Sequence, residues 1–191
     1  MILFALDNFK NFTSANNIYN IIKRKNFSKI KYYKVNLSDG GPGLLEVDFI
    51  KKFKKIKIIT FNSENTKINS FYRYDTRNKV AYIELSKICG VEKKKLKNYN
   101  FYLKTSFGLG VVISHAIKKK PKEIIIGMGG SDTADLGIGL ANALGVIFYN
   151  KNNKVIDLKK NGWNEICKID NKSLKETRKK LKKIKLRILS D

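Results

Sequence analysis

Glycine-rich runs at the ends of strand-like segments are the feature that most limits how this chain can fold. One run, residues 38–43, follows a strand-like segment and precedes helical spacing, and a second, residues 127–131, does the same. A third, residues 105–110, opens another helical segment. In open α/β sheets, ligands bind where loops leave the carboxyl ends of the strands. The pattern therefore predicts an α/β fold with a ligand site built from these loops.

The remaining segments agree with an α/β fold that contains one antiparallel part. We expect the early, middle and late strands at 2–6, 32–37, 56–61, 71–77, 80–84, 123–126 and 184–189. Polar turns separate the three middle strands, which is typical of antiparallel pairing. We expect helices at 16–24, 44–53, 108–117 and 136–144, and a hairpin at 146–156. The lysine-rich tail at 173–185 is interpreted as a solvated connection to the last strand, not as a membrane-surface helix.

The charge of the chain defines one partner class to consider. The formal net charge is +24, so nucleic acid or an anionic surface is the first partner to test. Most of the basic residues are lysines spread along the chain, whereas arginine is the side chain that reads phosphate and guanine with two hydrogen bonds. We therefore interpret the charge as a compositional drift and do not expect a nucleic-acid partner.

Cysteine and histidine usage excludes several site classes. Cys89 and Cys167 are far apart in the sequence, which favours neither a disulfide framework nor a zinc site. His115 is the single histidine and is interpreted as a packing residue. No stretch reaches the ~18 apolar residues of a membrane span, and residues 1–6 read as a strand and not as a signal peptide. We expect a cytoplasmic protein without a membrane partner.

The run from Gly127 to Ser131 carries the strongest chemical signal. A strand that delivers glycines and a hydroxyl to a helix start exposes backbone N–H groups that suit a phosphate or a carboxylate. Asp132 and Asp135 follow at a spacing suited to a metal ligand or a base. The run is neither a Walker loop nor a dinucleotide fingerprint. A tight turn with an N-cap is the alternative interpretation, and both remain open.

Five motifs in the same order resemble the class I glycerate kinase family. They are Asp7-Asn8-Phe9-Lys10 with Ser14-Ala15, Ser38-Asp39-Gly40-Gly41-x-Gly43, Ile83-Glu84-x5-Gly90, Thr105-Ser106-Phe107-Gly108-x-Gly110, and Gly127-x-Gly129-Gly130-Ser131-x-Thr133-x-Asp135-x-Gly137-x-Gly139. Ala143-Leu144-Gly145 and the final Leu189-Ser190-Asp191 match as well. The resemblance covers essentially the whole chain.

The resemblance implies a magnesium-dependent kinase that transfers the γ-phosphoryl group of ATP to glycerate, giving 2-phosphoglycerate. It implies a flavodoxin-like lobe combined with a second mixed α/β lobe, with the active site in the cleft between them. Residues 1–60 would begin the first lobe, and residues 61–191 would form a truncated second lobe, incomplete at the C-terminus.

The resemblance also implies roles for individual residues. Catalytic roles fall to Lys10, Asp135 and Asp191, and magnesium binding to Asp39 and Asp135. Binding of the phosphates or the substrate falls to Asp7, Ser38, Asp39, Gly40, Gly41, Gly43, Thr105, Ser106, Gly108, Gly110, Gly127, Gly129, Gly130, Ser131 and Thr133. Which aspartate binds metal and which accepts the hydroxyl proton stays open.

The chain departs from the family pattern in two ways. Bulkier or apolar residues replace polar or minimal ones in the loops, at Phe12, Pro42, Val111, Ala134 and Leu136. The family's chain also continues past the aspartate matched by Asp191, so the sequence resembles an N-terminal half. We expect a separate C-terminal half or a homo-oligomer as partner, because missing strands leave an unpaired sheet edge. The alternatives are a non-catalytic remnant that binds a nucleotide or small acid, and a basic nucleic-acid-binding protein.

Overall fold

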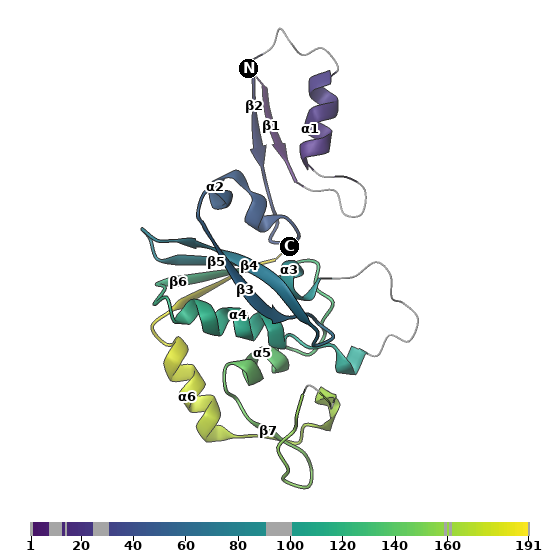
Figure 1. Cartoon of the computed structure of the whole chain (residues 1–191), viewed down its shortest axis with the longest axis vertical. Helices are drawn as coiled ribbons and strands as arrows, with labels where there is room; N and C mark the ends of the chain where they lie inside the picture. Colours follow the sequence, from purple (N-terminus) through teal and green to yellow (C-terminus); the bar gives the residue numbers. More distant parts are fainter. Residues whose placement is uncertain are drawn as a thin grey trace.

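The computed structural model shows an elongated α/β molecule and describes residues 2–7, 13, 15–24, 31–90, 101–158, 160 and 162–190. Figure 1 shows a small β–α–β unit at one end, the larger sheet in the middle, and α6 with β7 at the other end. The predicted α/β class is confirmed.

The small unit at one end consists of β1 (Ile2–Leu6), α1 (Ala15–Arg24) and β2 (Tyr32–Asn36). The two strands pair in parallel, with Ile2 opposite Tyr32 and Leu6 opposite Asn36. Side chains alternate between the two faces, so Phe4 and Tyr32 lie on the side of α1, where Tyr19 contacts Tyr32. One parallel pair and its crossover helix therefore form the described part of this unit.

The central sheet has the order β3-β4-β5-β6-β9. Its strands are β3 (Lys54–Phe61), β4 (Lys67–Asp75), β5 (Val80–Glu84), β6 (Glu123–Gly127) and β9 (Lys185–Leu189). The pairs β3–β4 and β4–β5 are antiparallel, whereas β5–β6 and β6–β9 are parallel. The carboxyl ends of β5, β6 and β9 therefore meet at one edge of the sheet, and the glycine-rich run at 127–131 begins there. The run at 38–43 follows β2 of the small unit instead.

Helices cover both faces of the central sheet (Figure 1). One face packs against α4 (Phe107–Ile117), whose Leu109, Val112 and Ile113 join the main apolar core. The other face packs against η1 (Leu44–Glu46) and α2 (Asp48–Lys51) through Leu44, Leu45 and Ile50. Three short elements lie near the sheet edge: α3 (Ser86–Cys89), η2 (Phe101–Leu103) and α5 (Ile138–Ala143).

The far end of the molecule contains β7 (Phe148–Tyr149), η3 (Trp163–Glu165), β8 (Lys168–Ile169) and α6 (Asn171–Leu181). A separate small core of Val146, Phe148, Ile156 and Leu158 holds this end together. The Asp170 side chain caps α6 by accepting a hydrogen bond from the Ser173 N–H at 2.6 Å. No helix within the described ranges is long and apolar enough to cross a membrane.

Several local expectations differ from the structure. The predicted helix at 44–53 is divided into η1 and α2, because Val47 between them is extended, with φ −57° and ψ 134°. The hairpin turn at 149–155 forms, but the main partner of β7 is β8, which comes later in the chain. The domain division at residue 60 stays a prediction; β3, which ends at Phe61, pairs with β4 over its whole length.

Candidate functional site

Two of the glycine-rich loops lie against each other at the carboxyl edge of the sheet. The Gly129 N–H donates to the Gly40 carbonyl at 3.1 Å, and the Met128 N–H donates to the Leu189 carbonyl at 3.0 Å. A Cβ on Gly129 would lie 2.6 Å from the Gly41 Cα, so only glycine allows this approach. Residues 38–43 and 127–131 thus form one structure, which we call the loop crossing.

Polar groups line the outer side of the loop crossing. Ser38 and Asp39 side chains accept hydrogen bonds from the N–H groups of Gly40 and Gly41, at 3.2 and 2.7 Å. The Asp7 carboxylate, just past β1, accepts one from the Asp39 N–H at 3.2 Å. The structure therefore brings Asp7 and Asp39 together, as a shared site would need.

Around the other loop, several backbone donors have no acceptor among the residues that the structure describes. None of the described residues accepts a hydrogen bond from the N–H groups of Gly130, Ser131 or Thr133. Ser131 pairs with Gly90 in an antiparallel bridge, which holds its backbone next to α3. The Asp132 N–H between Ser131 and Thr133 donates to the Cys89 carbonyl at 2.7 Å. The adjacent N–H groups of Gly130 and Ser131 can donate to the oxygens of an anion.

Glu84 fixes the first loop to the sheet, although it was not among the predicted site residues. Its side chain is 2% exposed at the end of β5. It accepts hydrogen bonds from the Gly43 and Leu45 N–H groups at 3.1 and 3.0 Å and from the Ser86 hydroxyl at 2.6 Å. The sequence signal that could have identified Glu84 is its place at the end of an otherwise apolar strand. A buried carboxylate there needs several hydrogen-bond donors around it.

The third glycine-rich loop has a different structure. Asp135, 2% exposed, accepts hydrogen bonds at Oδ2 from the Ser106 N–H, the Ser106 hydroxyl and the Gly139 N–H, at 2.8, 2.9 and 3.0 Å. Its Oδ1 accepts from the Gly137 N–H at 3.2 Å. We call residues 105–110 together with Asp135 the aspartate anchor. The side chain joins the start of α4 to the start of α5.

The glycines of the aspartate anchor are required by packing. A Cβ on Gly108 would overlap the Phe61 carbonyl of β3, and one on Gly110 would lie 2.6 Å from the Ala143 Cβ of α5. Thr105 and Ser106 are also buried, and the Thr105 hydroxyl accepts from the Phe107 N–H at 3.1 Å. Phosphate contacts by Gly108 and Gly110 stay a prediction, and packing accounts for both glycines without them.

A second cluster surrounds Lys104, a buried residue that the sequence patterns did not mark. Its Nζ lies 2.8 Å from Asp132 Oδ2 and 3.0 Å from Glu64 Oε1, and the Ser63 hydroxyl donates to the same Asp132 oxygen at 2.8 Å. Burial alone would lower the pKa of Lys104, but the hydrogen bonds and charges of the two carboxylates outweigh it and raise that pKa. Asp132, considered above as a metal ligand or base, is thus held by an ion pair.

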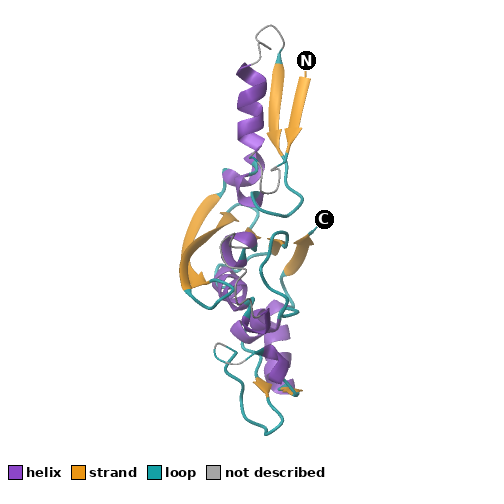
Figure 2. Cartoon of the chain, turned by 90° about the vertical axis from the view of Figure 1, so that its right-hand side faces the viewer, coloured by secondary structure: helices purple, strands orange, loops and turns teal. Residues whose placement is uncertain are grey.

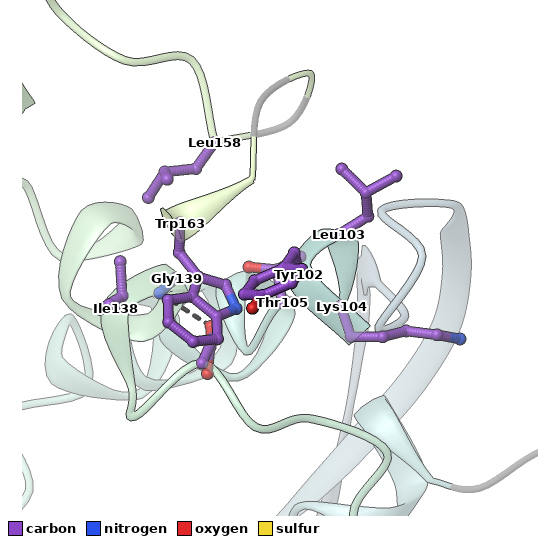
Figure 3. A pocket seen from close by; sticks show the side chains of 9 residues that line it. Tyr102, Leu103, Lys104, Thr105, Ile138, Gly139, Leu158 and Trp163 are labelled. Atoms are coloured by element: carbon purple, nitrogen blue, oxygen red, sulfur yellow. Dashed lines mark hydrogen bonds between the residues drawn. The ribbon is translucent and has the colours of Figure 1, made fainter. Parts of the chain in front are cut away.

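A small hollow lies beside the aspartate anchor (Figure 3). Tyr102 and Trp163 lie over it with ring centroids 5.2 Å apart, and Thr105, Asp135 and Gly139 line it as well. It holds about 180 Å³ of empty space, its open mouth included. Sites for drug-sized ligands measure roughly 300–1,000 Å³. The hollow is therefore too small to hold a nucleoside triphosphate.

Two of the predicted site residues, Lys10 and Asp191, lie outside the described residues. Among the described residues, no group of three or more His, Cys, Asp or Glu side chains could hold a metal ion by itself. His115 is a packing residue in the structure: its Nδ1 lies 3.1 Å from the Tyr72 hydroxyl, and burial, with Lys118 and Lys119 nearby, lowers its pKa.

Comparisons of the sequence with known proteins found one matching family. The model of the glycerate kinase family matches residues 2–191. The chain is 31% identical to a glycerate kinase of Bacillus cereus, covering 100% of this chain and 50% of that protein. It is 29% identical to the glycerate 2-kinase of Escherichia coli, covering 88% of this chain and 45% of that protein. The chain spans about half the length of the curated relatives it matches.

A solved structure shows the same fold. The chain superposes on a glycerate kinase 2 structure from Salmonella typhimurium LT2 with a TM-score of 0.74 and 26% sequence identity. The match covers 98% of this chain and 51% of that one. The described fold therefore corresponds to about half of that larger structure.

Proposed function

The chain belongs to the glycerate kinase family, and from that premise we propose that it supplies one half of the active site of an ATP-dependent glycerate kinase. The loop crossing carries the proposal, because it joins the carboxyl ends of β2, β6 and β9 through direct backbone contacts. Phosphoryl transfer depends on positioning and on stabilising spread negative charge, and fixed backbone donors serve both. We propose the cytoplasm as the location, since the reaction consumes ATP.

The available donors match the chemistry of a polyphosphate. The N–H groups of Gly130, Ser131 and Thr133 would hold phosphate oxygens, with the Ser131 hydroxyl beside them. The glycines at 127 and 129 leave no side chain between the two loops. These groups bind and orient; they need no proton transfer of their own.

We assign the acidic residues two different roles, magnesium binding and structural positioning. Mg²⁺ is usually held by one or two carboxylates together with water and substrate phosphates. We propose Asp7 and Asp39 for this role, because the Asp7 carboxylate lies against the Asp39 backbone N–H and the Asp39 carboxylate against the Gly41 N–H. Bound there, Mg²⁺ would neutralise phosphate charge. The oxygens of Asp135 already accept four hydrogen bonds, so we assign Asp135 a positioning role through Ser106 and Gly139.

We propose that the 2-hydroxyl of glycerate is the acceptor, following the name of the Escherichia coli relative. The hydroxyl oxygen forms a bond to the γ-phosphorus as the bond to the β–γ bridging oxygen breaks. ADP leaves, and the hydroxyl proton passes to a base. Lys10 and Asp191 are the proposed groups for charge neutralisation and proton transfer.

An ADP-release assay with glycerate and Mg-ATP tests the proposal. We expect turnover when the 191-residue chain is combined with the second half of the Bacillus cereus glycerate kinase, with that intact enzyme as positive control. Asp7→Asn combined with Asp39→Asn should lower turnover at least tenfold and be rescued in part by higher Mg²⁺. Stabilisation by Mg-ATP without turnover would instead indicate a binding remnant and would remove the catalytic proposal.

A further inference from the structure

The outer edge of β9 offers backbone groups for one more strand. β9 pairs with β6 on one side, and no described strand lies on its other side. Lys185 N–H donates to the Lys122 carbonyl at 2.9 Å, and the Leu189 carbonyl accepts from Met128 at 3.0 Å. Because backbone direction alternates along a strand, Leu186 and Ile188 direct their N–H and C=O groups away from β6. An open row of donors and acceptors follows.

The side chains at this edge are apolar and uncovered. Leu186 and Ile188 are 46% and 54% exposed. Their partners in the β6–β9 register are Ile124 and Ile126 of β6. These two side chains are buried beneath α4, with 0% and 3% exposure. The apolar face of the sheet therefore continues past the helix that covers it and ends in contact with solvent. We call β9 with these two side chains the β9 edge.

A second uncovered surface lies on the β1–α1–β2 unit. Figure 2 shows α1 on one side of β1 and β2, and no described helix or strand covers the other side. Leu3, Tyr33 and Val35 are 62%, 48% and 39% exposed on that other side. Parallel strands are normally covered on both faces. We call these three side chains the bare face.

We propose that the β9 edge and the bare face together bind one polypeptide partner, the counterpart of the second half of the glycerate kinase relatives. The partner would supply a strand that hydrogen-bonds to β9 and an apolar surface that covers Leu3, Tyr33 and Val35. The matched relatives are about twice as long as this chain, which covers 50% of one and 51% of the solved structure. The unmatched half therefore has the length needed to cover both surfaces. The inference rests on family membership and not on turnover.

Co-expression of the 191-residue chain with the second half of the Bacillus cereus glycerate kinase tests the proposal by binding alone. We expect a 1:1 complex in light scattering, and at least tenfold slower amide hydrogen exchange at Leu186 and Ile188. A homodimer of the chain with no bound second half would overturn the proposal, since a second copy would then be the occupant.

Matched substitutions locate the contact. Ile188→Lys should weaken the complex at least tenfold, whereas Ile59→Lys should not, because Ile59 lies on β3 at the opposite edge of the same sheet and is 67% exposed. Leu186→Pro is the second edge variant: it removes an outward N–H, and proline is tolerated on edge strands at such positions. Equal affinities of all three variants would overturn the proposal.

A covalent fusion tests the same contact when the affinity of the separate chains is too weak for a complex to be seen. Joining the second half to the end of the chain raises its effective concentration to the millimolar range. We expect the amides of Leu186 and Ile188 to become protected in the fusion, together with those of β1 and β2. Unprotected amides at Leu186 and Ile188 in the folded fusion would overturn the proposal even if the fusion were an active kinase. An inactive fusion with protected amides would reject the kinase proposal alone.

Discussion

The loop crossing and the aspartate anchor have the same local sequence character but opposite surroundings. Both combine glycines with hydroxyl residues at the end of a strand or the start of a helix. In the anchor, Ser106 donates hydrogen bonds to Asp135, and both residues are buried. At the crossing, Asp39 is exposed and several N–H groups have no acceptor among the described residues. Glycine-rich loops therefore serve packing in one place and leave donors for a ligand in the other.

The largest expected effect is the loss of the anchoring carboxylate. Asp135→Ala leaves four hydrogen-bond donors without their acceptor, and we expect the free energy of unfolding to fall by about 4 kcal/mol. Asp39→Ala, at the exposed crossing, should cost less than about 1 kcal/mol. Urea denaturation of both variants measures the difference. Equal losses would show that the two regions do not differ as described.

Overpacking of the anchor is expected to be the next largest effect. Gly108→Ala places a Cβ against the Phe61 carbonyl of β3, which should lower the free energy of unfolding by about 3 kcal/mol. Ser114→Ala, on the same helix, is the control and should change it by less than about 0.5 kcal/mol. A Gly108→Ala chain as stable as the original would mean that α4 can shift away from β3.

Substitution within the crossing should affect binding more than folding. In Gly129→Ala the new Cβ must separate the two loops, because it would lie 2.6 Å from the Gly41 Cα. We expect Mg-ATP affinity to fall about tenfold, equal to about 1.4 kcal/mol, as measured by calorimetric titration. The Gly108→Ala chain, kept folded at low temperature, should retain its affinity. The reverse pattern would assign the ligand to the anchor.

The smallest expected effect concerns pH. The raised pKa of Lys104 means that its ion pairs stabilise the fold fully below the ordinary value of 10.5 and lose this contribution as the pH rises through the raised value. The original chain should therefore lose more stability than Lys104→Met between pH 10 and pH 12, in unfolding experiments on both. Tyrosines titrate in both chains, so the difference reports Lys104. Parallel curves would contradict the assignment.

Local patterns predicted most of the strands but not their long-range contacts. The apolar run after Pro121 predicted a strand at 123–126, and β6 spans Glu123–Gly127. The division of the predicted helix at 44–53 into two short helices could not be predicted from local patterns. The Leu45 N–H there donates a hydrogen bond to Glu84, which is distant in sequence.

The candidate site was also predictable only in part, because its residues meet through long-range contacts. The glycine runs marked the loops, but only the parallel pairing of β6 and β9 brings Leu189 to Met128. Glu84 and Lys104 lay outside the selected residues, since their importance comes from burial and from partners on other elements. The roles of Lys10 and Asp191 stay predictions.

The backbone character of the loop crossing has a consequence for how this chain tolerates change. The chain holds 40 lysines and arginines, yet residues 38–43 and 127–131 contain none of them. Main-chain contacts such as Gly129 to Gly40 involve no side-chain functional group. A sequence can therefore exchange most of its surface for lysine and asparagine while this meeting point of two loops keeps its shape, provided that its few glycines are retained.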